Sequence, residues 1–194
     1  MSQPIARARG TRTTIAVAVL AVTALVIGVA VALGSERRSS FAADVGDLDA
    51  AAVPHGWAPL VEAAAEHAGI PAPVLAAQIE VESNWRAGAR SPVGAQGLSQ
   101  FMPDTWTDYG RGGDPFDPAH AIAAQGRYLA DLLELARSSG IDGDPVELAL
   151  AGYNAGFGAV QRHDGIPPFP ETERYVAQIR DRVAAYERPT AENS

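Results

Sequence analysis

The chain has 194 residues, contains no cysteine and carries a formal charge of −8. This length suffices for one domain with an appendage, and the lack of cysteine excludes disulfides and thiolate chemistry. All 15 basic residues are arginines, and five of them precede residue 39, whereas 22 of the 23 acidic residues follow it. A domain this acidic is a poor nucleic-acid binder, because a phosphate backbone requires clustered cations.

An uncharged, strongly apolar run of 21 residues, 13–33, follows three arginines near the N-terminus. As a helix it would cover roughly 30 Å, which matches the hydrocarbon core of a bilayer. It is longer than the core of an ordinary secretory signal, so we expect a transmembrane signal anchor with residues 1–12 in the cytoplasm and the rest of the chain outside. The alternative is a signal peptide cleaved near residues 30–32, which would leave the protein secreted.

Residues 34–56 are rich in Ser, Ala, Asp and Gly and are expected to form a flexible tether. Beyond them, apolar spacing predicts an all-α domain over residues 57–187, without alternating strand patterns. The predicted helices cover residues 59–68, 73–84, 118–138, 145–153 and 172–187, most of them bounded by Pro, Gly or a capping Asp. The polar tail, 188–194, is expected to be disordered.

The helix predicted for residues 73–84 carries a glutamate on its apolar face. The stripe consists of Val74, Leu75, Gln78, Ile79 and Glu82. Glu80 lies about 200° further round and is expected to face solvent. Burial on such a face raises the pKa of a carboxyl group, as a general acid near neutral pH requires. A surface glutamate at a helix end is the alternative, and spacing alone does not decide between them.

A loop rich in glycine and proline, residues 91–103, follows this helix and carries Ser91, Gln96 and Gln100. Glycines in such a loop permit tight turns and close approach of a ligand. The polar side chains could bind a sugar or orient the carboxyl group, although a plain connector between helices would have a similar composition.

Three motifs occur in order along the domain. The first is Glu-Ser at 82–83, Ser91, and Gly-Ala-x-Gly-Leu-x-Gln-x-Met-Pro over 94–103; the second is Ala-Gly-Tyr-Asn-Ala-Gly over 151–156; the third is Glu-Thr-Glu-Arg-Tyr-Val over 171–176. Together they resemble the signature of the soluble lytic transglycosylases, in the goose-type lysozyme-like superfamily. The resemblance covers residues 57–187, and the stretch 113–118 also resembles a membrane-bound branch of lytic transglycosylases.

The resemblance implies a lysozyme-like helical fold that cleaves the β-1,4 bond between N-acetylmuramic acid and N-acetylglucosamine and leaves a 1,6-anhydromuramic product. It implies Glu82 as the single general acid/base, with no metal and no cofactor. The residues that it assigns to substrate binding are Ser91, Gln100, Met102, Tyr153, Asn154 and Tyr175. For the aromatic residues, core packing is the alternative. Two positions depart from the common pattern: Ser99 stands where Met is usual, and Gly152 where Ala is usual.

The expected partners are peptidoglycan glycan strands and, through the N-terminal helix, the membrane, with cell-wall or secretion machinery as further possible partners. Nucleic acid is not expected. Two other functions stay open. A goose-type lysozyme-like muramidase would use Asp104 or Asp108 to position water. A non-catalytic, membrane-tethered peptidoglycan-binding module would not need Glu82. The four histidines are scattered and lack the spacing of metal ligands.

Overall fold

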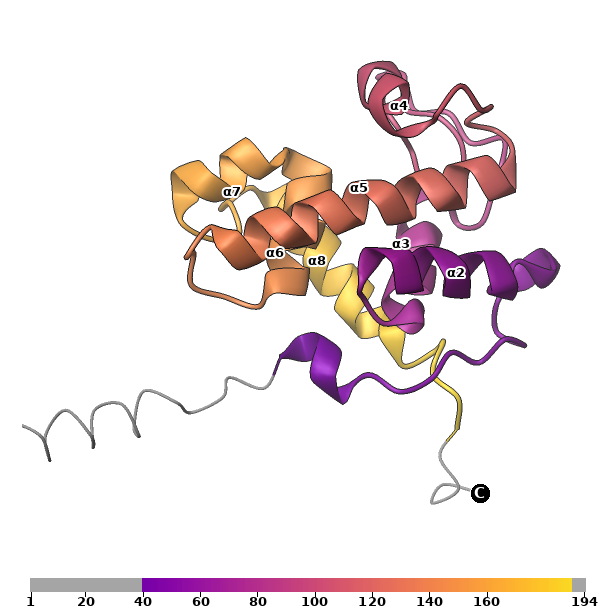
Figure 1. Cartoon of the computed structure of the whole chain (residues 1–194), viewed down its shortest axis with the longest axis horizontal. Coiled ribbons are helices and arrows are strands. Elements are labelled where there is room, and N and C mark those ends of the chain that lie inside the picture. The colour runs from indigo at the N-terminus through magenta and orange to yellow at the C-terminus, as the bar shows by residue number, and fades with distance from the viewer. Residues whose placement is uncertain (1–39, 190–194) are drawn as a thin grey trace, which may run out of the picture. The chain divides into compact units, whose positions relative to one another are not determined.

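The structure, a computed structural model, describes residues 40–189 (Figure 1). Its helices are α2 (Ala58–Ala68), α3 (Ala72–Ser83), α4 (Pro103–Tyr109), α5 (Pro118–Ser138), α6 (Pro145–Ala155), α7 (Phe157–His163) and α8 (Pro170–Val183), preceded by two 3-10 turns, η1 (Phe41–Asp44) and η2 (Pro54–Gly56). Between residues 40 and 189 the only β-type pairing consists of isolated bridges. The prediction of an all-α domain is therefore confirmed for this region.

The long helix α5 runs through the middle of the domain, as Figure 1 shows. It packs against α2 and α6, while α3 packs against α8, and α6 also contacts α7 and α8. Side chains from all of these helices form one apolar core. Helix α3 is buried from Pro73 to Ile79 around its whole circumference, not on one stripe alone. At its C-terminal end Glu80, Val81 and Glu82 are only half-buried, so this end of α3 lies at the edge of the core.

Local signals account for several helix boundaries. The Asp117 side chain accepts a hydrogen bond from the backbone N–H of His120 at 3.0 Å, and Pro118 then occupies the first turn of α5. Helix α8 begins at Pro170, two residues before the predicted start, and ends at Val183 instead of 187. No bounds were predicted for helices α4 and α7, because each has 7 residues and is too short to show an apolar period.

Residues 40–56 pack against the helical domain, which corrects the prediction of a flexible tether for this stretch. Leu48 and Val53 are buried in the core, and the Ser40 hydroxyl donates to Asp144 Oδ2 at 2.7 Å. The apolar residues of this segment stand singly among polar ones. The composition of the segment therefore resembles that of a linker, although these apolar side chains are buried.

The C-terminal segment continues this packing. The Arg188 backbone N–H donates to the Asp47 carbonyl at 2.8 Å, so the predicted disordered tail does not begin at 188. Residues 190–194 and the predicted transmembrane anchor at 13–33 lie outside the described residues. Within 40–189, none of the helices is both long enough and apolar enough to cross a bilayer.

Candidate active site

Glu82 lies in the last turn of α3, and its side chain is half-buried. Burial raises the pKa of this carboxyl group from 4.5 to about 8, and a hydrogen bond from Tyr175 lowers it by less. Among the described residues, no other carboxylate contributes to this shift. Glu82 is therefore largely protonated at neutral pH because of its surroundings, as expected for a carboxyl group on the apolar face of this helix.

A chain of hydrogen bonds links the Glu82 carboxyl group to two buried side chains. Tyr175, in α8, donates its hydroxyl proton to Glu82 Oε1 at 2.5 Å, and Gln78, one turn earlier in α3, donates from Nε2 to the Tyr175 hydroxyl at 2.9 Å. Because the amide occupies the hydroxyl oxygen, the tyrosine proton is directed at the carboxyl group. Gln78 Oε1 is buried and lacks a partner within the described region.

The backbone that follows Glu82 turns sharply away from the helix. Asn84 and Trp85 both have positive φ angles, 50° and 60°, which is unfavourable for residues other than glycine. The Trp85 indole holds this turn, since it is buried and donates to the Tyr186 hydroxyl at 2.7 Å. Tyr186 in turn donates to Glu80 at 2.8 Å. Glu80 is therefore half-buried and paired, which corrects the expectation that it faces solvent.

The loop side chains predicted to bind substrate are held by the loop itself. Ser91 Oγ accepts the backbone N–H of Ala95 at 2.9 Å, and Gln100 Nε2 donates to the Gly97 carbonyl at 2.8 Å. Met102 is 43% exposed. In the described structure none of these three side chains hydrogen-bonds to Glu82, so Ser91 acts here on the loop conformation. A role for these residues toward substrate stays a prediction.

The second motif ties this loop and α8 to α6. Tyr153 donates its hydroxyl proton to the Ser99 carbonyl at 2.8 Å, and burial together with the nearby Glu82 raises the pKa of Tyr153. The exposed Asn154 accepts a hydrogen bond from Thr172 Oγ1 at 2.8 Å. Tyr153 and Tyr175 are therefore gathered around Glu82, whereas Asn154 is bound to the start of α8.

Residues 59–176 match the family described as Transglycosylase SLT domain, and this match spans all three motifs. The chain belongs to the transglycosylase SLT domain family. This match confirms the family that the three motifs predict.

Relatives of this SLT domain agree with that placement. The membrane-bound lytic murein transglycosylase F 2 of Alkalilimnicola ehrlichii is 38% identical over 97 residues, which are 50% of this chain and 21% of that protein. The membrane-bound lytic murein transglycosylase F of Shewanella loihica is 34% identical over 87 residues, 45% of this chain and 18% of the relative. The chain therefore matches about a fifth of the length of each of these relatives.

Two solved structures share the fold. The 70 kDa soluble lytic transglycosylase SLT70 of Escherichia coli aligns with a TM-score of 0.53 and 28% identity, covering 69% of this chain and 24% of its own. An inactive mutant of the lytic transglycosylase Slt of Pseudomonas aeruginosa gives a TM-score of 0.53 and 26% identity, covering 66% and 23%. The likeness is again confined to the SLT domain, which is a minor part of each of those chains.

The two departures from the common SLT pattern have structural reasons. Ser99 is fully buried and donates to Gln125 Oε1 at 2.7 Å, so its side chain points into the core and not into a groove. A Cβ on Gly152 would lie 2.9 Å from Phe157 Cδ2, so glycine makes room for this ring at the start of α7. Neither change touches Glu82.

The aromatic cluster around Tyr153 in this SLT domain was not predicted from the sequence. The Tyr128 ring lies 5.0 Å and the Phe101 ring 5.9 Å from that of Tyr153, between ring centroids. These rings come from α5 and the loop, so their contact with Tyr153 cannot be predicted from residue spacing along the chain. Gln78 was on the predicted stripe, and a polar residue on an apolar face was the available signal for its role.

Glu82 is expected to make the stability of this SLT domain depend on pH. The unfolded chain ionises near 4.5 and the folded chain near 8, so the penalty for burying Glu82 is absent below the lower value and grows until the upper one is passed. Glu82→Gln should therefore unfold at a higher temperature than the wild type. The difference in unfolding free energy between the two should widen between about pH 5 and 9 to a few kcal/mol. Thermal unfolding across this range measures the difference. A difference independent of pH would contradict the raised pKa.

Proposed function

We propose that this protein is a peptidoglycan lytic transglycosylase, which cleaves the β-1,4 bond between N-acetylmuramic acid and N-acetylglucosamine with Glu82 as its single acid/base. The observation that carries the proposal is a lone carboxyl group whose pKa is raised to about 8 and which is hydrogen-bonded by Tyr175. Such a group can donate a proton at neutral pH and take one back. The side chains of Asp104 and Asp108, the carboxylates that a hydrolase would need, are exposed on α4.

In the proposed reaction the neutral Glu82 donates its proton to the leaving glucosamine oxygen while the bond to C1 of the muramic residue breaks. The muramic 2-acetamido group stabilises the cationic centre at C1. The Glu82 carboxylate then accepts the proton of the muramic 6-hydroxyl as O6 bonds to C1, which closes the anhydro ring and restores the acid. No water is consumed, so one carboxyl group suffices where ordinary glycosidases use two.

The other side chains have supporting roles in this proposal. Tyr175 donates to Glu82 and stabilises the carboxylate after it has released its proton. Tyr153 fixes the loop beside Glu82, while Gln100, Met102 and Asn154 offer surface to the glycan strand. Ser91 keeps the loop in the shape that presents these groups.

We also propose that the enzyme acts outside the cytoplasm, anchored in the cell membrane by residues 13–33. The relatives named membrane-bound support a membrane association. Such an anchor would keep the enzyme at the outer face of the membrane, where cell-wall or secretion machinery could meet it.

Digestion of purified peptidoglycan with the full chain, followed by mass spectrometry, tests the proposed reaction. Anhydromuramic ends are expected, each lighter by one water than a hydrated reducing end. Hydrated ends would establish a muramidase instead. Binding to the wall without release of any product would establish a peptidoglycan-binding module.

Gln78→Leu tests whether the buried amide acts on Glu82 through Tyr175. Gln78 Nε2 makes Tyr175 a stronger donor, which favours the ionised form of Glu82. We expect Gln78→Leu to move the alkaline limb of the pH–activity profile upward, while stability is kept or gained because a buried, unpartnered oxygen is removed. Parallel pH profiles and thermal unfolding measure both effects. An unmoved alkaline limb with lowered stability would assign Gln78 to packing alone.

A further inference from the structure

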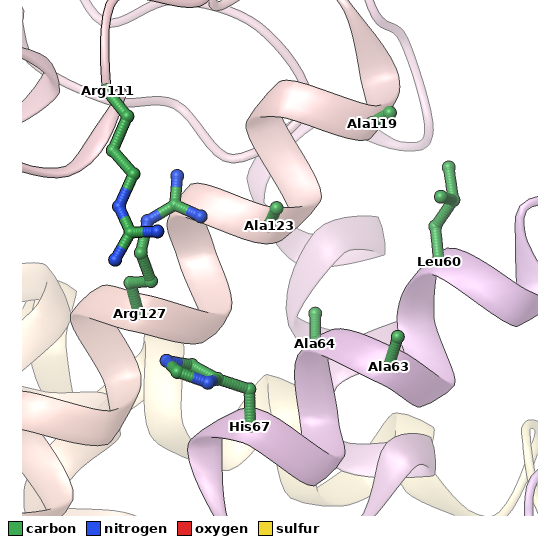
Figure 2. Close-up of a pocket in the computed structure, with 8 residues that line it drawn as sticks. All are labelled: Leu60, Ala63, Ala64, His67, Arg111, Ala119, Ala123 and Arg127. Carbon is green, nitrogen blue, oxygen red and sulfur yellow. The ribbon is translucent and has the colours of Figure 1, made fainter.

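A pocket of about 220 Å³ lies between α2, the N-terminal half of α5 and the loop that joins α4 to α5. Its lining is Leu60, Ala63, Ala64, His67, Arg111, Ala119, Ala123 and Arg127 (Figure 2). None of these residues belongs to the site around Glu82. The pocket has two different ends. Figure 2 shows the tips of Arg111 and Arg127 close together with His67 facing them, whereas alanines and Leu60 line the rest.

The cationic end lacks a countercharge. Within the described structure, neither Arg111 nor Arg127 forms an ion pair, although the chain carries 23 acidic residues. Arg127 is held in place by donating from Nε and Nη2 to the Tyr109 carbonyl at 3.0 and 2.6 Å. Burial and the proximity of Arg111 lower the pKa of Arg127. Two guanidinium groups that repel each other at the mouth of a pocket would be stabilised by a bound anion.

The backbone at Arg111 supports a role for this side chain. Arg111 has a φ of 51°, a left-handed conformation that costs about 1 kcal/mol or more for a residue with a side chain. Both neighbours, Gly110 and Gly112, are glycines, which adopt such a conformation more easily. A need for the Arg111 guanidinium beside the pocket would explain why an arginine occupies this unfavourable backbone conformation.

We propose that this pocket binds a small carboxylate with an adjoining methyl group, of the kind presented by the C-terminal alanine of a short peptide. Arg111 would bind the planar carboxylate in the two-pronged manner that suits arginine. Arg127, whose Nε and Nη2 already donate to the Tyr109 carbonyl, would add its positive charge. The alanine-lined end would receive the methyl group. At about 220 Å³ the pocket is below the size that drug-like ligands occupy, so it fits the end of a chain and not a whole saccharide.

The choice of ligand rests on the proposed function, because the stem peptides of peptidoglycan end in alanine carboxylates. A site for the peptide would let the domain bind strands that carry uncleaved stems in preference to bare glycan. Free small carboxylates could supply the same chemistry, so the test separates the two sources.

Calorimetric titration of the purified full chain with N-acetyl-D-alanyl-D-alanine, its C-terminal amide and inorganic phosphate tests the pocket directly. We expect the acid to bind at least about ten-fold more tightly than the amide or phosphate. Arg111→Gln, which removes a charge, and Ala123→Leu, which fills the alanine-lined end, should each weaken binding of the acid about ten-fold. Arg162→Gln, an equal change of charge at an exposed position in α7, is the control and should leave binding unchanged. Equal binding of acid and amide would overturn the proposal, as would phosphate binding that Ala123→Leu leaves intact.

Cleavage assays distinguish a wall peptide from a free carboxylate. On glycan strands with intact stem peptides, Arg111→Gln should lower kcat/KM at least about three-fold relative to Arg162→Gln, and on strands stripped of peptides the two should be equal. A loss of the same size on both substrates would overturn the assignment to the stem peptide. Absence of cleavage by the wild type would refute the proposed function instead, and the titration would still decide whether the pocket binds the dipeptide.

Discussion

Glu82→Gln should reduce the rate of the proposed peptidoglycan cleavage by about a thousand-fold or more. In the proposed reaction the amide can neither donate the proton that the leaving sugar needs nor accept the proton of the 6-hydroxyl. Among residues 40–189, no other carboxylate contributes to the shift in the pKa of Glu82. The variant keeps the shape of the side chain and can still accept the hydrogen bond from Tyr175. Chromatographic measurement of soluble muropeptides released per unit time checks the loss.

Glu80→Gln is the matched control for this experiment. Glu80 lies in the same helix, is also half-buried and also accepts a hydrogen bond from a tyrosine, Tyr186. We expect it to keep its activity within a few-fold of the wild type. Because Glu82→Gln is expected to be more stable than the wild type, its inactivity could not be attributed to unfolding. Equal losses in the two variants would show that both carboxyl groups act structurally.

Gly97→Ala should have the largest effect on folding. A Cβ at this position would lie 1.8 Å from the Pro115 carbonyl oxygen, and Gly97 also has a φ of +75°. The obstacle is backbone and cannot rotate aside, so the loop between α3 and α4 would have to separate from the segment before α5. We expect a loss of about 3 kcal/mol or more in unfolding free energy. Activity should fall as well, because the same loop presents the Ser99 carbonyl to Tyr153.

Gly94→Ala separates the clash from the backbone strain. Gly94 lies in the same loop with a φ of +99°, but a Cβ there would meet nothing within 4 Å. Only the conformational cost of the positive φ remains, about 1 kcal/mol. Urea unfolding of both variants measures the difference. Similar losses at the two positions would mean that the contact between Gly97 and Pro115 is not tight in solution.

Features that neighbouring residues control could be predicted from the amino-acid sequence. Asp117 and Pro118 mark the start of α5 because a cap and a proline act within one turn, and the predicted bounds, 118–138, agree with the structure. The apolar spacing of α3 likewise predicted that Glu82 is withdrawn from solvent, since periodicity is a property of a single helix. It did not show that α3 is enclosed on all sides, which leaves Glu80 half-buried as well. The order of the three motifs was enough to predict the family.

Features that depend on residues distant in the chain became visible only in the folded domain. Tyr175 reaches Glu82 across 93 residues only because α8 packs against α3, and the docking of residues 40–56 requires a completed surface to receive Leu48. The pairing of Arg111 with Arg127 arises where the loop after α4 returns over α5. Local propensities do not predict such long-range contacts, because many arrangements of the helices have similar local energies and packing between the helices selects among them.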